Sequence, residues 1–108
     1  MVKPALRVKL PKAAKRGEIV EIMTLISHPM DTGLRKDKDG KLIPRKIINE
    51  FFCIYNGDIV FRTNMYEAIS ANPLIQFTFI AKESGSLDLF WHEDGGEVYT
   101  TVRKIKVY

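Results

Sequence analysis

The stretch Ile47-Ile48-Asn49-Glu50-Phe51-Phe52-Cys53-Ile54-Tyr55, followed by Asn56-Gly57 and then Ile59-Val60-Phe61, decides the fold class of this 108-residue chain. Apolar, β-branched and aromatic residues dominate its first nine positions, which is typical of a β-strand. The Asn-Gly pair supplies the two positive φ angles of a tight hairpin turn. The stretch therefore predicts two antiparallel strands, about Lys46–Tyr55 and Asp58–Thr63.

The rest of the chain repeats this strand-and-turn pattern on both sides of the hairpin. Between the strands, Asn64–Asn72 is the least strand-like segment, and we expect one irregular helical turn there, closed by Pro73. Seven short strands with Gly-containing turns predict an all-β fold, an immunoglobulin-like antiparallel β-sandwich forming one domain over residues 1–108. A small closed barrel is the alternative. The five further strands are expected at Ala5–Leu10, Glu18–Ser27, Leu74–Lys82, Leu87–His92 and Glu97–Val107.

Several of these strands are apolar on both faces. In the central one, Ile47, Phe51, Cys53 and Tyr55 share one face, and Ile48, Phe52 and Ile54 share the other. A two-layer sandwich buries one face of each sheet, so the surplus predicts an apolar outer surface for a permanent protein partner. Long loops folded over that face are the alternative. The residues we expect on the partner surface are Phe52, Ile54, Phe77, Phe79 and Phe90.

The chain carries a net charge of +4, and the basic excess lies mostly in Lys3–Arg16 and Arg35–Lys46. An acidic partner fits this balance. Nucleic acid fits less well, because neither basic stretch contains the aromatic residues that stack on bases. No apolar run reaches the ~20 residues that span a bilayer, so we expect no membrane partner. Without an apolar signal region near the N-terminus, composition alone indicates the cytoplasm.

Side chains suited to catalysis or metal binding are few. A copper site on a β-sandwich needs a cysteine and a histidine close together on one loop. Cys53 instead lies in mid-strand, far in sequence from His28 and His92, and is expected to be a buried apolar residue with a raised pKa. The pair Glu93-Asp94 is expected to be solvated at a hairpin tip. We therefore predict no enzyme activity, no catalytic residue, no metal and no cofactor. A stand-alone electron-transfer or metal-binding β-sandwich remains the alternative, with a basic nucleic-acid-binding module behind it.

Several motifs, in this order along the chain, resemble the SoxZ family, a subunit of the sulfur-oxidation carrier complex. The likeness extends from Leu6 to Val107. The motifs are Leu25-Ile26-Ser27-His28-Pro29-Met30-Asp31-Thr32-Gly33 with Arg35-Lys36-Asp37, Ile43-Pro44-Arg45-Lys46-Ile47-Ile48-Asn49, Tyr55-Asn56-Gly57, Ala71-Asn72-Pro73 and Glu83-Ser84-Gly85.

The resemblance implies an immunoglobulin-like sandwich that forms an obligate heterodimer with SoxY. SoxY holds sulfur intermediates on a cysteine in a flexible Gly-Gly-Cys-Gly-Gly arm, and the pair carries them among the enzymes of thiosulfate oxidation. The chain ends Lys-Ile-Lys-Val-Tyr without such an arm, and Cys53 does not match the carrier cysteine. We therefore expect neither SoxY nor a fused SoxY–SoxZ chain.

The resemblance also implies a compartment and further contacts. Family members work in the periplasm and are exported with a signal-bearing SoxY, which reverses the cytoplasmic expectation. Other Sox enzymes would make transient contacts. Independently of the resemblance, an apolar partner face that lacks its partner tends to bind a copy of itself, so we expect that the isolated chain can form a homo-oligomer. The charged loop from His28 to Arg45 is the expected docking element, unless its start is simply a packed corner. Its candidate residues are His28, Pro29, Met30, Arg35, Lys36 and Arg45.

Overall fold

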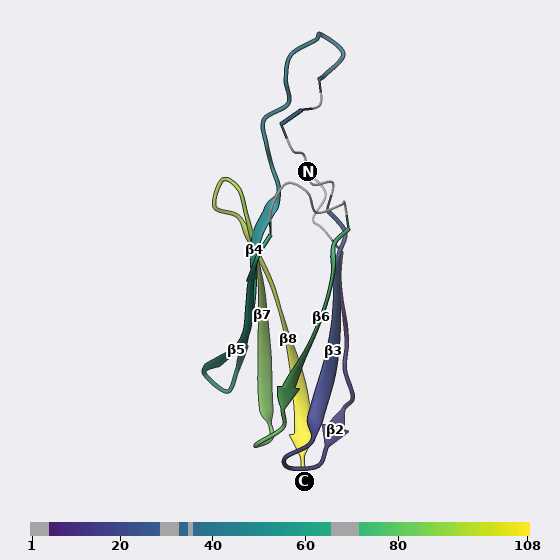
Figure 1. Ribbon diagram of the computed structural model, residues 1–108, viewed down its shortest axis with the longest axis vertical. Helices are drawn as coiled ribbons and strands as arrows, with labels where there is room; N and C mark the ends of the chain where they lie inside the picture. The colour runs from purple at the N-terminus through teal and green to yellow at the C-terminus, as the bar shows by residue number, and fades with distance from the viewer. Residues whose placement is uncertain (1–4, 29–32, 35, 66–71) are drawn as a thin grey trace.

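The computed structural model describes residues 5–28, 33–34, 36–65 and 72–108. It is an all-β sandwich of two sheets that face each other along a molecule measuring 58 × 22 × 19 Å (Figure 1). The predicted fold class is confirmed, with eight strands instead of seven. The strands are β1 (Leu6–Lys9), β2 (Ala13–Ala14), β3 (Ile19–Ile26), β4 (Ile48–Tyr55), β5 (Asp58–Asn64), β6 (Leu74–Ile80), β7 (Gly85–Glu93) and β8 (Val98–Val107).

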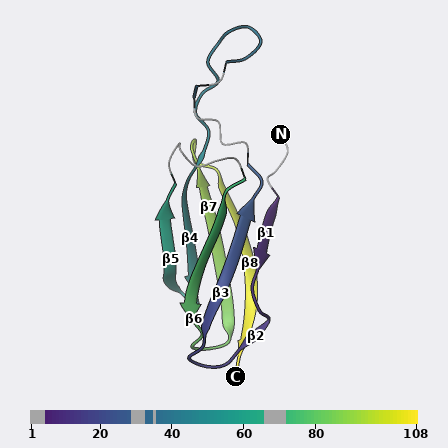
Figure 2. The same ribbon diagram turned by 45° about the vertical axis from the view of Figure 1, so that its right-hand side comes forward.

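The strands divide between a three-stranded sheet in the order β1-β3-β6 and a five-stranded sheet in the order β2-β8-β7-β4-β5 (Figure 2). All pairs are antiparallel except β2 with β8, which is parallel. The extra strand β2 has only two alanines and carries no strand signal in its sequence. None of the described segments forms a helix long and apolar enough to cross a membrane.

The hairpin that decides the fold class forms as predicted. β4 and β5 pair across Asn56 and Gly57, whose φ angles are 48° and 89°. Two consecutive positive φ angles are typical of a type I′ turn, whose backbone twist matches the right-handed twist of the two strands that it connects. The helical turn expected at Asn64–Asn72 falls largely on residues 66–71, outside the described residues.

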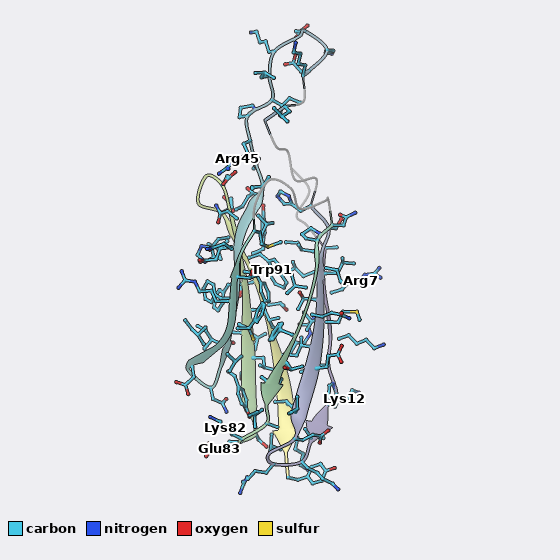
Figure 3. All side chains as sticks on the ribbon, in the orientation of Figure 1. Arg7, Lys12, Arg45, Lys82, Glu83 and Trp91 are labelled. Atoms are coloured by element: carbon cyan, nitrogen blue, oxygen red, sulfur yellow. The ribbon has the colours of Figure 1, made fainter. Side chains whose placement is uncertain are left out.

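The core lies between the sheets and is built on aromatic side chains of both layers. Trp91, which lies between the sheets in Figure 3, is fully buried. Phe51 is also fully buried, and its ring centroid lies 5.0 Å from that of Trp91. Phe51 also packs 5.8 Å from Phe77 of the opposite sheet. Alternate residues of β7 are buried, which is the two-residue period of a strand with one face on the core. Outside the core, the loop containing residues 36–45 extends beyond one end of the sandwich (Figure 1).

Candidate functional site

The outward surface of the five-stranded sheet carries an apolar group of side chains. Phe52 of β4 lies opposite Phe90 of β7, and their rings stack with centroids 4.7 Å apart. Ile54 follows on the same face and pairs with Ile59 of β5. On β8, Val102 lies opposite Asp88, which itself pairs with Ile54, so this row continues across the sheet. We call the following set the outer apolar face: Phe52, Ile54, Ile59, Phe90, Val98 and Val102.

Three of the four aliphatic members of this face are strongly exposed for their type, and Ile54 is half-buried. Ile59 is 57% exposed, Val102 51% and Val98 43%. Arg62, which forms a 2.7 Å ion pair with Glu50, lies beside them, and Asp88 lies within the face between Ile54 and Val102. Exposed aromatic and aliphatic side chains gathered among polar groups are typical of a protein-binding surface. Three of the five residues predicted to bind a partner, Phe52, Ile54 and Phe90, belong to it.

The other two predicted members, Phe77 and Phe79, were assigned to the wrong surface. They are only 7% and 5% exposed and lie between the sheets. Phe77 stacks on Phe61 at 4.6 Å, and Phe79 packs at 5.0 Å from Tyr55. The physical reason is the register of β6 on β3, which turns Phe77 and Phe79 toward the core and alternate residues toward solvent.

Of the predicted docking loop, the structure describes residues 28, 33–34 and 36–45. Lys36 is exposed and pairs with Leu42 in a short antiparallel bridge. Asp37 closes the turn between them by accepting hydrogen bonds from the backbone N–H groups of Asp39 and Lys41. Leu34 and Leu42 are 83% and 61% exposed. Of the remaining candidates, Pro29, Met30 and Arg35 lie outside the described residues.

Arg45 fixes the root of this loop to the hairpin between β7 and β8 (Figure 3). Its guanidinium donates two hydrogen bonds to the carboxylate of Asp94, at 2.8 and 3.1 Å. Asn49 and the backbone N–H of Ile47 donate to the same carboxylate. Burial opposes ionisation of Asp94, but the hydrogen bonds from Asn49 and Arg45 outweigh it and lower its pKa.

His28 lies inside the sandwich and not on a docking surface, which corrects its assignment to the docking loop. It is 3% exposed, and its Nε2 lies 2.6 Å from Oε2 of Glu93. The hydroxyl of Tyr99 donates to the same oxygen at 2.7 Å. The alternative interpretation, a packed corner where the chain leaves β3, is the one that the structure supports.

The expectation that Glu93 and Asp94 are solvated is also wrong. Glu93 is 3% exposed, and Lys46 approaches its second carboxylate oxygen at 3.7 Å. Burial alone would raise the pKa of Glu93, yet the hydrogen bonds from His28 and Tyr99 and the charge of Lys46 lower it. Burial and the bond to Glu93 raise the pKa of Tyr99 to about 12. This network joins the segment that follows β3 to β7 and β8 at the loop end of the sandwich.

Cys53 is fully buried, as predicted, and its surroundings do not activate it. Burial, with a smaller contribution from Asp88, raises the pKa of its thiol to about 12. His92 lies on the opposite face of the same sheet, beside Phe52 at 5.2 Å. Cys53 and His92 do not come together as a copper site would require, because the two side chains lie on opposite faces of the sheet. Among the described residues, no three His, Cys, Asp or Glu side chains gather as a metal site would require.

Several of the motifs that carry the family resemblance contact one another in the fold. The Tyr55 hydroxyl accepts hydrogen bonds from the N–H groups of Lys82 and Glu83 and donates to the carbonyl of Glu83. At the other end, Asn72 exchanges two 3.0 Å hydrogen bonds with the backbone of His28. These motifs therefore tie loops of different strands together.

Sequence reasoning missed part of the outer apolar face. Ile59, Val98 and Val102 were available as strand residues, but their faces follow only from the pairing of β4 with β5 and of β7 with β8. For Val102 the sequence did contain a signal. Thr100, Val102 and Lys104 share one face of a strand with a two-residue period, and the polar residues on both sides of Val102 indicate that this face is exposed.

A family model described as sulphur oxidation protein SoxZ matches residues 8–104, nearly the whole chain. No curated protein sequence matches the chain significantly. Among solved structures, a superoxide reductase (neelaredoxin) from Ignicoccus hospitalis aligns with a TM-score of 0.73 and 16% identity, covering 98% of this chain and 82% of that one. The sulfur carrier protein SoxY from Chlorobium limicola f thiosulfatophilum aligns with a TM-score of 0.68 and 17% identity, covering 96% and 79%. At such identities the likeness shows a shared fold alone.

Proposed function

The chain belongs to the SoxZ family of sulphur oxidation proteins, and we propose that it is the noncatalytic subunit that binds SoxY and helps to present it to the Sox enzymes. A role in the sulfur-oxidation system follows from the family. The finer role rests on one observation, the outer apolar face of the five-stranded sheet. We propose that SoxY covers this face in a permanent heterodimer.

The chemistry of the outer apolar face supports a permanent partner over a transient one. Stacked Phe52 and Phe90 form a rigid aromatic centre, and Ile59 and Val102 extend it with more than half of their side chains exposed. Large aromatic side chains at the centre of an interface contribute most of its binding energy. Permanent interfaces are also the more hydrophobic kind.

Charge substitutions on this face test the proposal. Phe90→Glu and Val102→Glu each place a carboxylate where SoxY would exclude water, so we expect the affinity for SoxY to fall at least about 30-fold. Met23→Glu, on the outward side of the three-stranded sheet, is the matched control and should bind normally. Affinity is measured with purified SoxY by calorimetry, and circular dichroism checks that each variant is folded. Folded Phe90→Glu and Val102→Glu proteins with undiminished affinity would overturn the proposed interface.

The loop containing residues 36–45 is proposed as the docking contact for the Sox enzymes. Lys36 is exposed there, and Arg45 holds the loop root in place through Asp94. Basic side chains on a projecting loop speed association with acidic surfaces more than they strengthen it. Replacing Arg35 and Lys36 by Glu should lower thiosulfate-dependent turnover of the reconstituted system, most strongly at low salt. Unchanged turnover would contradict the docking role.

We further propose that the protein works in the periplasm, exported together with SoxY. The support is the family's partnership with an exported SoxY, which the resemblance implies. Fractionation of cells that express this chain with SoxY, or with SoxY lacking its signal, tests it. The chain should reach the periplasm only in the first case.

A further inference from the structure

The strand β6 forms an unusually unprotected edge of the three-stranded sheet. Within the described part of the chain it pairs with β3 alone (Figure 2). Open hollows of about 430 and 590 Å³ lie along this side, between β6 and β5. Soluble proteins usually protect such edges with charged side chains, proline or very short strands.

The other edge strands carry that protection and β6 does not. β1 contains Arg7 and Lys9, and β5 contains Asp58 and Arg62. The remaining edge is the two-residue β2, which lies beside the basic strand β8. β6, with the sequence Leu-Ile-Gln-Phe-Thr-Phe-Ile, has no charge, no proline and no glycine over seven residues. An uncharged edge of this length readily pairs with another strand.

The backbone of β6 shows which groups are available for pairing. The carbonyl of Pro73 accepts from Ile26, and the N–H of Ala81 donates to Glu18, so odd-numbered residues direct their backbone groups toward β3. Because these directions alternate along a strand, the even-numbered residues direct theirs to the open edge. Those residues are Leu74, Gln76, Thr78 and Ile80.

The residue types of β6 are symmetric about Phe77: polar Gln76 and Thr78 flank it, apolar Ile75 and Phe79 follow, and aliphatic Leu74 and Ile80 lie at the ends. We propose that the β6 edge binds the β6 edge of a second copy of this chain, antiparallel across a twofold axis at Phe77, to give a continuous six-stranded sheet. In this register Gln76 lies opposite Thr78 of the second copy, and Leu74 lies opposite Ile80. All four residues direct their backbone groups to the edge, so both pairs are hydrogen-bonded pairs. A twofold axis pairs the same surface on both copies.

The side chains on the outward face of the sheet fit the same register. Leu74 is 56% exposed and pairs with Leu25 of β3, and Ile80 is 52% exposed and pairs with Ile19, which is 69% exposed. When the two copies pair, Leu25 and Leu74 of one copy continue into Ile80 and Ile19 of the other, which gives a four-residue apolar row. The twofold axis generates a second, identical row. Cross-strand apolar pairs of this kind are the unit of sheet stabilisation. A shift of register by two residues would place Leu74 opposite Thr78 and lose the row.

Two double variants with the same positions altered test the register. Gln76→Lys with Thr78→Lys places like charges opposite each other across the axis and should weaken the dimer at least about tenfold. Gln76→Lys with Thr78→Glu places opposite charges there and should preserve the dimer.

Thr78→Pro tests the hydrogen bonds of the edge. It removes one backbone N–H that faces the open edge and leaves the hydrogen bonds to β3 in place, so it should weaken the dimer while the chain stays folded. Sedimentation velocity over a concentration series measures the dimer in each case.

The proposal is overturned if the unmodified chain stays monomeric at its highest soluble concentration. It is overturned equally if both double variants dimerise to the same extent. A third outcome would also overturn it: amide exchange at Leu74, Gln76, Thr78 and Ile80 that slows only when SoxY is added would identify a SoxY strand as the occupant. The inference does not depend on the proposed function, because Gln76 and Thr78 lie on the sheet opposite Phe52 and Phe90. The lysine variant should therefore still bind SoxY.

Discussion

The backbone of Gly85 packs directly against the side chain of Asn56, so closely that a Cβ at Gly85 would lie 1.7 Å from Oδ1 of Asn56. That oxygen accepts a 3.1 Å hydrogen bond from the N–H of Ser86, and the N–H of Asn56 donates to the Ser86 carbonyl. The contact joins the β4–β5 turn to the start of β7. Two motifs that carry the family resemblance, Tyr55-Asn56-Gly57 and Glu83-Ser84-Gly85, are thus one structural unit.

Gly85→Ala should destabilise the protein because the new methyl group displaces the Asn56 amide. We expect the free energy of unfolding to fall by about 1–3 kcal/mol, the usual cost of forcing extra volume into a packed position. Urea unfolding followed by tryptophan fluorescence measures it. Asn56→Gly keeps the positive φ and removes the clashing atoms, so Gly85→Ala should cost less in that background. Equal costs in both backgrounds would show that the contact with Asn56 is not the cause.

Tyr55→Phe tests the hydrogen bonds that hold the turn before β7. The hydroxyl is the acceptor for the N–H groups of Lys82 and Glu83, at 3.2 and 3.0 Å, and its loss leaves partly buried polar groups unpaired. Such a loss costs about 1–3 kcal/mol. The same denaturation experiment measures it, with Tyr108→Phe as control, since Tyr108 is 66% exposed. A Tyr55→Phe protein as stable as the Tyr108→Phe control would contradict the prediction.

The Glu93 network predicts a specific pH dependence of stability. Because the pKa of Glu93 is lowered in the folded protein, the unfolded chain binds the proton more readily. The stabilisation is therefore fully present above the unfolded pKa, near 4.5, and is lost as the pH falls through the folded pKa. Glu93→Gln removes this part, so its stability should fall less steeply than that of the unmodified protein below pH 4.5.

Unfolding free energies of both proteins across the acid range measure this difference. Glu21→Gln, at an exposed position of β3, is the control and should follow the unmodified protein. At neutral pH, Glu93→Ala removes the hydrogen bonds that Glu93 makes to buried His28 and to the partly buried Tyr99 hydroxyl, and should cost roughly 1–3 kcal/mol. Parallel pH profiles for Glu93→Gln and the unmodified protein would show that the carboxylate does not carry the effect.

Sequence reasoning predicted the parts that depend on local pattern. The Asn56-Gly57 turn and the two-residue period of the strands fix the hairpin and the fold class. The same period predicts that Phe77 and Phe79 share one face of a strand, but it does not predict whether that face is directed to the core or to solvent. The pairing of β6 with β3 decides it, and pairing is not local. Glu93 and Asp94 follow the same rule, since their partners His28, Arg45 and Asn49 come from distant segments that only the folded chain brings together.

Cys53 should be unreactive in the native protein, because burial raises its pKa to about 12. At pH 8 a thiol with that pKa is ionised in roughly one molecule in ten thousand, and the thiolate is the form that reacts with alkylating reagents. Iodoacetamide should label Cys53 only as fast as the protein unfolds, which mass spectrometry over a time course measures. Thr100→Cys in a Cys53→Ala background puts a thiol on the exposed face of β8 and should be labelled rapidly.

The Cys53→Ala protein should also support thiosulfate-dependent turnover with SoxY, since a noncatalytic subunit needs no thiol of its own. Rapid native labelling of Cys53, or loss of turnover in a folded Cys53→Ala protein, would place sulfur chemistry on this chain and contradict its proposed role.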